Sequence, residues 1–152
     1  MSKELELLTT HADDAAPTDG YGERFYELQN EYDARTKHRN GVVYTPVACV
    51  DFINASVAAL LKRHFGVGMN DARVEVVDPF AGTGIFVSRA IENGLIDPSG
   101  QRVTQIELSP ESARRASDNA VESMRLAGVD GRVETVCADT FALDPDTLEP
   151  RE

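Results

Sequence analysis

The stretch Val74-Glu-Val-Val-Asp-Pro-Phe-Ala-Gly-Thr-Gly84 decides the fold of this chain. It begins with a short run of β-branched residues, which favours a buried strand, and it ends in a turn with two glycines. Residues 85–93 follow with helical spacing, and Gly94 closes them. A strand, a glycine-rich turn and a helix in direct succession are typical of the first unit of a parallel α/β sheet.

Two further strands are predicted downstream of this unit. Residues 102–107 and 132–137 have strand composition. Between them, Ser109 and Pro110 open a long helix that Gly128 ends. The order strand, helix, strand, helix, strand is the pattern of right-handed βαβ units. We therefore expect a Rossmann-like α/β fold with three parallel strands and flanking helices.

The chain divides into four parts by composition. Residues 1–20 mix acidic and small residues without periodicity, so we expect a mobile acidic tail. Residues 21–68 form an N-terminal helical segment that carries a Tyr-Thr-Pro motif. Residues 69–142 contain the strands and the glycine-rich turn, and residues 143–152 return to loop composition.

The N-terminal segment is predicted to contain a long helix. Thr45 can cap it, Pro46 suits its first position, and Gly66 stops it. Its apolar residues repeat at helical spacing: Val50, Ile53, Val57, Leu60 and Leu61.

Composition excludes several classes of protein. The 152 residues, of which 41% are hydrophobic, suit one globular domain. No apolar run of about 18 residues and no signal peptide are present, so we expect a cytoplasmic protein without a membrane partner. Cys49 and Cys137 are far apart and are expected to be small core residues, and the three histidines are isolated. No metal site is therefore predicted.

The glycine-rich turn is the predicted ligand site. Gly82 and Gly84 permit positive φ angles and a close approach of a ligand to the backbone. Val87 stands where the dinucleotide fingerprint has its third glycine, and no Gly-Lys-Ser/Thr follows, so neither that fingerprint nor a P-loop is present. Asp78 heads the turn, which favours a ligand with a cationic centre and an amine.

Three acidic residues are predicted to share one pocket with this turn. Asp78, Glu107 and Asp139 each lie at the end of a predicted strand. The carboxyl ends of parallel strands line one crevice, although each residue alone would be an ordinary loop acid. In such a crevice the carboxylate of Glu107 can accept both hydroxyl protons of a ribose, and that of Asp139 can accept from the amine of an adenine.

These residues resemble one enzyme family. Asp78-Pro-Phe-Ala-Gly-Thr-Gly84 resembles the S-adenosylmethionine motif of DNA adenine-N6 methyltransferases, and Gly41-Val-Val-Tyr-Thr-Pro46 resembles the segment preceding it in enzymes of the gamma arrangement. The similarity continues through residues 105–109 and 137–139 and spans about residues 21–142. It is closest to the methylase portions of type I and single-chain restriction-modification enzymes. The resemblance implies an incomplete S-adenosylmethionine-dependent methyltransferase fold, with the cofactor-binding half in the region after residue 68.

The resemblance implies S-adenosylmethionine as the cofactor and assigns residues to its site. The methionine end of the cofactor would be lined by Tyr44, Thr45 and Pro46. Without the later motif, the same segment would be interpreted as a plain helix start. The glycine-rich loop would pack under the backbone of the cofactor, Glu107 and Asp139 would hold ribose and adenine, and Leu108 would pack on the adenine. The complete implied set is Tyr44, Thr45, Pro46, Asp78, Pro79, Phe80, Ala81, Gly82, Thr83, Gly84, Glu107, Leu108 and Asp139.

The sequence departs from the family in its catalytic element. Family members hold the target adenine with Asn, Asp or Ser followed by Pro-Pro-Tyr or Pro-Pro-Phe after the fourth strand, and this sequence has no Pro-Pro dipeptide. We therefore expect the cofactor-binding N-terminal part of a site-specific DNA adenine-N6 methyltransferase, from a truncated gene, a split gene or an expressed fragment. It would have no catalytic residue of its own, it would meet DNA through the complete enzyme, and a downstream polypeptide would be its partner.

Two other functions remain open at this point. One is a non-catalytic or partner-dependent module that binds S-adenosylmethionine. The other is a small-molecule methyltransferase, which would leave the Tyr-Thr-Pro segment unexplained.

The charge balance predicts that the protein is stabilised by salt. The net charge is −11, and only three of the fifteen basic residues are lysines. This composition suits a halophilic cytoplasm, and the alternative is an ordinary acidic domain. Because salt screens self-repulsion, the melting temperature should rise from low to molar potassium chloride. A thermal melt across this series measures it. A flat or falling midpoint would contradict the halophilic interpretation.

Overall fold

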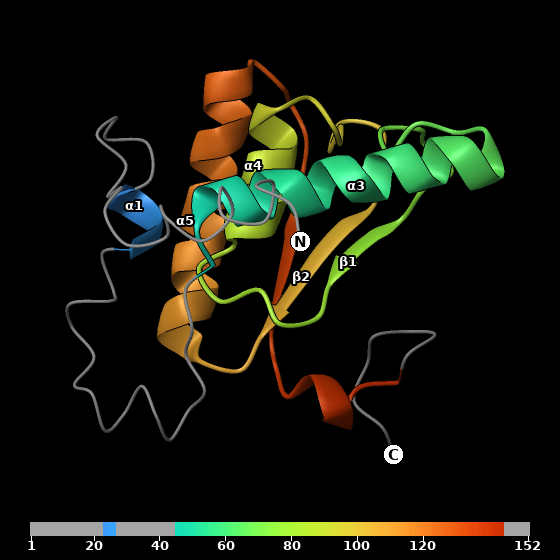
Figure 1. Cartoon of the computed structure of the whole chain (residues 1–152). Coiled ribbons are helices and arrows are strands. Elements are labelled where there is room, and N and C mark those ends of the chain that lie inside the picture. The colour runs from blue at the N-terminus through green and yellow to red at the C-terminus, as the bar shows by residue number, and fades with distance from the viewer. Residues whose placement is uncertain (1–22, 27–44, 145–152) are drawn as a thin grey trace, which may run out of the picture.

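The computed structural model describes residues 23–26 and 45–144. Three predicted features lie outside the described residues: the tail at 1–20, most of the loop at 143–152, and Tyr44. The elements, labelled as in Figure 1, are α1 (Glu23–Tyr26), α3 (Val47–Phe65), β1 (Val76–Asp78), α4 (Ile85–Glu92), β2 (Val103–Glu107), α5 (Pro110–Ala127), β3 (Glu134–Cys137) and the 3₁₀ helix η3 (Thr140–Ala142).

The sheet has three parallel strands in the order β1-β2-β3. Val76 of β1 is paired with Val103 of β2, and Gln105 of β2 is paired with Thr135 of β3. The central strand is buried from Val103 to Ile106, as expected for a strand with neighbours on both sides. The predicted parallel α/β arrangement of three strands is confirmed.

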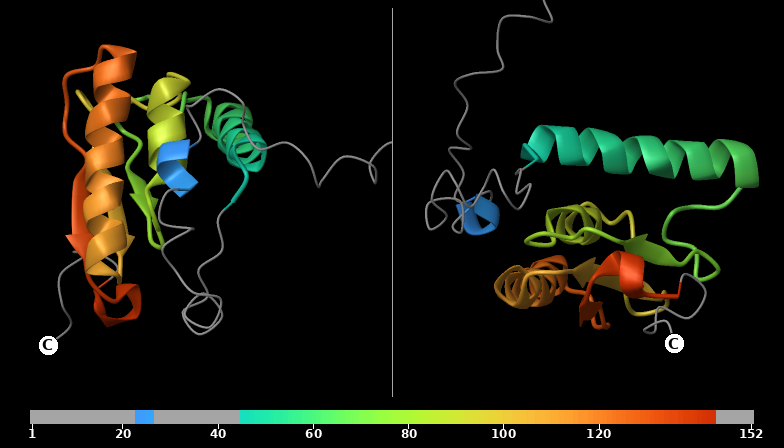
Figure 2. Two further views of the ribbon diagram at one scale, coloured as in Figure 1. Left: turned by 90° about the vertical axis from the view of Figure 1, so that its left-hand side faces the viewer. Right: turned by 90° about the horizontal axis from the view of Figure 1, so that it is seen from below.

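Two helices cover one face of this sheet. Figure 2 shows α4 and α5 side by side on the same side of the strands, with α3 crossing next to α4. A core cluster joins α4, β2 and α5 and consists of Val87, Ala90, Ile91, Ile96, Val103 and Met124. A second, smaller cluster joins α1, α3 and α4 through Phe25, Val50 and Ile85. The second cluster lies next to the glycine-rich turn, because Ile85 directly follows Gly84.

The helix ends follow the sequence signals, with one correction. Ser109 accepts a hydrogen bond from the Ser112 amide at the start of α5, and Gly66 and Gly128 end α3 and α5 with positive φ angles. The predicted cap of α3 by Thr45 is wrong, since Pro46 occupies the N-cap position without a side-chain capping bond. Pro46 has an extended backbone, with φ −57° and ψ 141°, so the helix begins only at Val47.

The burial of α3 and of the two cysteines differs from the prediction. Val50 and Asn54 are the buried residues of α3, whereas Ile53, Val57 and Leu60 are at least 40% exposed. The helix extends past α4 in Figure 1, so the apolar stripe continues beyond its packing partner. Both cysteines are exposed and unpaired, so the prediction that they are core residues is wrong.

The described part of the chain contains neither a membrane span nor a metal cluster. None of its helices is both long and apolar enough to cross a bilayer. No group of three or more His, Cys, Asp or Glu side chains gathers within it at a distance suited to a metal ion.

Candidate ligand-binding site at the glycine-rich loop

Backbone hydrogen bonds fix the loop between β1 and α4 over the end of β2. The Ala81 amide donates to the Ile106 carbonyl at 2.9 Å, and the Gly84 amide donates to the Ala81 carbonyl at 2.8 Å. The Gly82 amide donates to Oε2 of Glu107 at 2.8 Å. The loop is therefore held by the neighbouring strand before any ligand binds.

Glycine is needed at the two loop positions for different structural reasons. Both have positive φ angles, 56° at Gly82 and 77° at Gly84, which disfavour any other residue. A Cβ atom at Gly84 would lie 2.9 Å from Oε1 of Gln105 and 3.0 Å from Cα of Ala116. A Cβ atom at Gly82 would meet nothing within 4 Å. Gly84 is thus required by internal packing, whereas Gly82 borders open space that a ligand can occupy.

Glu107, the last residue of β2, joins the loop to the start of α5. Its Oε2 accepts from the Gly82 amide, and its Oε1 accepts from the Ser109 amide at 2.9 Å. A carboxylate offers about four acceptor positions, so two remain for other donors. Glu107 can therefore fix the loop and still accept hydroxyl protons from a ligand.

Asp78, the last residue of β1, keeps one carboxylate oxygen without a partner. Its Oδ1 accepts from the Phe80 amide at 3.2 Å, whereas its Oδ2 is buried without a hydrogen bond among the described residues. Burial raises the pKa of Asp78; the hydrogen bond from Phe80 opposes this rise, and the negative charge of Glu107 adds to it. The ionised form of Asp78 is thus costly in this structure, and a cationic group beside it would relieve that cost.

Asp139 lies just after β3 and is exposed. Its Oδ1 accepts from the Phe141 amide at 3.0 Å and thereby caps η3. The next residue, Thr140, donates from its hydroxyl to the Pro79 carbonyl, which ties this turn to the glycine-rich loop. The predicted strand-end acids therefore lie at one end of the sheet, with Asp78 and Glu107 near enough to influence each other.

Exposed apolar side chains lie at the same end of the sheet. The rings of Phe80 and Phe141 are 5.7 Å apart, and they are 64% and 77% exposed. Leu108, which follows Glu107, is 69% exposed. Sequence reasoning included Phe80 and Leu108 but missed Phe141, whose signal was an aromatic residue two positions after a strand-end acid. These side chains offer an apolar surface for a flat ring.

Other predicted site residues are turned into the protein. Ala81 and Thr83 are buried, and the Thr83 hydroxyl donates to the Phe25 carbonyl of α1 at 3.2 Å. Only the backbone of these two residues is therefore available to a ligand. Thr45 and Pro46 precede Val47, which packs against the cluster of Phe25, Val50 and Ile85 beside the loop.

Comparison with known proteins gives similarity to solved structures only. No protein-family model and no curated protein matches the chain. The structure of the ATP-dependent Type ISP restriction-modification enzyme LlaBIII bound to DNA is similar with a TM-score of 0.62 and 26% identity, over 86% of this chain and 10% of that chain. The DrdV–DNA complex is similar with a TM-score of 0.65 and 22% identity, over 82% of this chain and 14% of that one.

A third similar structure is a nuclease-deletion mutant of the Type ISP enzyme LlaGI in complex with a DNA substrate mimic. Its TM-score is 0.54 and its identity 24%, over 95% of this chain and 16% of that chain. The present chain thus spans at most 16% of the length of these three similar chains. The similarity to LlaBIII supports the expected relationship to restriction-modification enzymes, and the other two similarities support the fold.

The two glycines should respond differently to alanine. Gly84→Ala should lower the free energy of unfolding by about 2–4 kcal/mol, because a strained φ angle and an overpacked contact add together. Gly82→Ala should cost only about 1–2 kcal/mol, because the strained φ angle is its sole penalty. Urea denaturation measures both. Equal losses in the two variants would contradict the assignment of Gly84 to packing and Gly82 to an open site.

The ionised carboxylate of Asp78 should lower the stability of the folded protein at neutral pH. Because its pKa is raised in the folded state, the folded state binds more protons, and Asp78 costs stability as pH rises above the usual range for a carboxyl. Asp78→Asn keeps the acceptor for the Phe80 amide and removes the charge. It should raise the melting temperature at pH 7 by roughly a few degrees.

The pH dependence provides the control for this prediction. Below the ordinary pKa of aspartate the carboxyl is neutral in both states, so the advantage of Asp78→Asn should vanish there. An Asp78→Asn variant that melts below the wild type at pH 7 would refute the raised pKa.

Proposed function

We propose that this chain binds S-adenosylmethionine and forms the methyl-donor half of a site-specific DNA adenine-N6 methyltransferase of a restriction-modification system. One observation carries the proposal. The glycine-rich loop has open space beside Gly82, and the partly unsatisfied carboxylate of Asp78 lies at the start of the same loop. The similarity to restriction-modification enzymes supports the same function.

The residues of the site fit the chemical groups of this cofactor. A cationic amine or sulfonium would compensate the buried Oδ2 of Asp78, which lacks a partner among the described residues. The remaining acceptor positions of Glu107 suit ribose hydroxyls. The apolar side chains of Leu108 and Phe141 suit an adenine ring, and the nearby Asp139 carboxylate suits its amine.

The bound cofactor would supply an electrophilic methyl group, and this chain would supply position and charge. Glu107 holds the Gly82 amide, so the backbone beside the ligand is fixed before binding. Asp78 provides a negative charge in a poorly solvated place, where it acts more strongly than in water. The transfer would require no covalent bond to this chain, so positioning of the cofactor relative to the target amine can account for much of the rate.

We propose that another polypeptide segment holds the target base. The 152 residues contain no Pro-Pro dipeptide, which the resembling family uses for this purpose. Within the described residues β1 pairs only with β2, and Val77 is 41% exposed. An unpaired strand edge is a template for a further strand. A segment that carries additional strands and the base-holding element would complete the site, and DNA would be met through that complete enzyme.

A second function is favoured by the same missing dipeptide. A non-catalytic or partner-dependent module would bind S-adenosylmethionine with the same residues and transfer nothing by itself. The two functions differ in methyl transfer and not in cofactor binding.

Calorimetry with S-adenosylmethionine tests the proposed site. The chain should bind it, and Glu107→Ala should weaken binding by roughly 1–3 kcal/mol, because charge-assisted contacts and the loop restraint are lost together. Glu111→Ala is the matched control, since Glu111 is an exposed acid four residues away at the start of α5. Absence of binding to the wild type, or equal affinity of both variants, would refute the proposed site.

Labelled methyl transfer to DNA separates the two functions. The chain alone should transfer no methyl group, since the base-holding dipeptide is absent from its sequence. Addition of a polypeptide with the missing strands and a Pro-Pro element should restore transfer if the chain is half of a methyltransferase. Binding without any restored transfer would favour the non-catalytic module.

A further inference from the structure

Helix α1 is hydrogen-bonded to the glycine-rich loop at Thr83. Thr83 lies between the two loop glycines, and its hydroxyl donates to the Phe25 carbonyl of α1 at 3.2 Å. On its other side the Thr83 carbonyl accepts from Nδ2 of Asn119 at 2.9 Å. Thr83 is only 5% exposed and Phe25 only 1%. Thr83 thus links the loop to α1 and to α5 through one hydrogen bond each.

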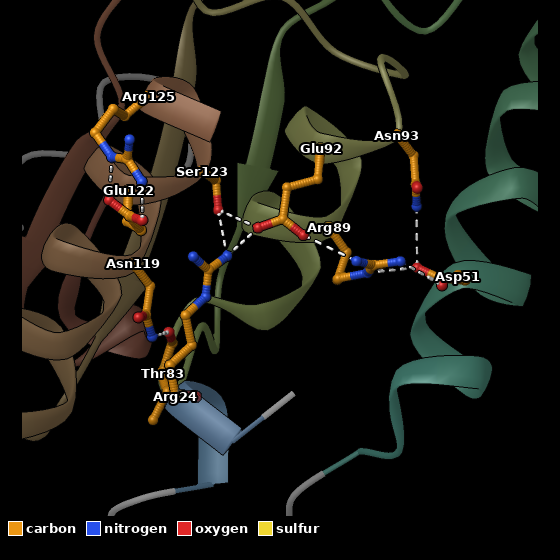
Figure 3. A network of polar contacts seen from close by, with 10 residues as sticks. All are labelled: Arg24, Asp51, Thr83, Arg89, Glu92, Asn93, Asn119, Glu122, Ser123 and Arg125. Carbon is orange, nitrogen blue, oxygen red and sulfur yellow. Dashed lines mark hydrogen bonds and ion pairs between the residues drawn. The ribbon is translucent and has the colours of Figure 1, made fainter. Parts of the chain in front are cut away.

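Arg24, next to Phe25, holds α1 in this position. Its guanidinium forms an ion pair with Glu92 of α4 and donates to Oγ of Ser123 of α5 at 2.8 Å (Figure 3). Ser123 in turn donates to Oε1 of Glu92 at 2.8 Å. The Arg24 guanidinium also lies 4.6 Å from the centre of the Phe25 ring. One side chain thus connects α1 with both helices that cover the sheet.

The same network contains a second arginine that does not depend on α1. Nη1 of Arg89 contacts the other oxygen of Glu92 at 2.9 Å, and Nε and Nη2 of Arg89 donate to Asp51 of α3 at 3.0 and 2.8 Å. The Glu92 side chain is only 6% exposed, so an unpaired charge there would be costly. Because Arg89 remains, removal of Arg24 would not leave Glu92 without a partner. A variant at position 24 should therefore release α1 while the α/β unit stays folded.

We propose that Arg24 is a positioning residue of the ligand site, which holds α1 against Thr83 and thereby keeps the loop in the conformation that binds ligand. The two glycines with positive φ angles give the loop conformational freedom, which the contacts from β2 at Ala81 and Gly82 remove only in part, since neither contact is made by Thr83. Docked α1 removes part of that freedom in advance. By thermodynamic reciprocity, a ligand at the loop then stabilises the docking of α1. The identity of the ligand rests on the proposed function, whereas the coupling between α1 and the loop does not.

Hydrogen exchange of the ligand-free protein tests the coupling by itself. Arg24→Gln should speed amide exchange in α1 and also at Gly82 and Gly84, whose amides are hydrogen-bonded within the site. Arg24→Lys keeps a charge for Glu92 and should lie between this variant and the wild type. Arg114→Gln is the control, since Arg114 pairs with Asp118 on an exposed face of α5 and should leave the loop amides unchanged. Faster exchange in α1 with unchanged loop amides in Arg24→Gln would overturn the proposal.

Thr83 offers a second pair of variants that perturbs the same contact from the loop side. Thr83→Val removes the hydroxyl donor to the Phe25 carbonyl, and Thr83→Ser keeps it. The valine variant should speed exchange in α1, whereas the serine variant should resemble the wild type. Equal α1 exchange in the two variants would show that the hydroxyl does not hold α1, and the proposal would fail.

Binding of S-adenosylmethionine measures the functional consequence. Arg24→Gln should weaken it by about 5-fold or more, and the ligand should slow α1 exchange in the wild type. If the wild type binds and Arg24→Gln binds equally well, the positioning role is wrong. If the wild type does not bind S-adenosylmethionine but the loop amides still respond to Arg24→Gln, the coupling stands and the proposed function is wrong.

Discussion

The carboxylate of Glu107 is the contact on which the rest of the site depends. It accepts from the Gly82 amide and from the Ser109 amide, so one side chain joins the end of β2, the glycine-rich loop and the start of α5. Ser109 is also the N-cap of α5. Because Glu107 of β2 holds the loop, the loop keeps its conformation without a ligand in the open space beside Gly82.

Beside this contact lies an electrostatically unfavourable group, the carboxylate of Asp78. The Oδ2 atom of Asp78 is buried and has no partner among the described residues, and the charge of Glu107 adds to the rise of the pKa of Asp78 that burial causes. A purely structural position would favour a neutral residue there, since Asn keeps the acceptor for the Phe80 amide without the charge. Buried, unsatisfied charge at a strand end is typical of a ligand site, where the missing interaction is supplied on binding.

The polar network behind the loop connects four helices around it. Glu92 of α4 lies between Arg24 of α1 and Arg89, and Arg89 extends the network to Asp51 of α3. Ser123 adds α5. Two arginines around one nearly buried carboxylate satisfy a charge that would otherwise be costly. The helices that flank the loop are thus tied together by polar contacts as well as by the small apolar cluster around Phe25.

The sequence by itself determined the three-stranded parallel fold, the glycine-rich turn and the order of the strand-end acids, because β-branched runs and positive φ angles are local properties of the chain. The tertiary structure decided which side chains meet. It exposed the cysteines and most of the apolar stripe of α3, and it brought Phe141 beside Phe80. Arg24 meets Glu92 and Ser123 across 68 and 99 residues of sequence. Such contacts depend on how helices pack against one another, which local sequence patterns do not encode.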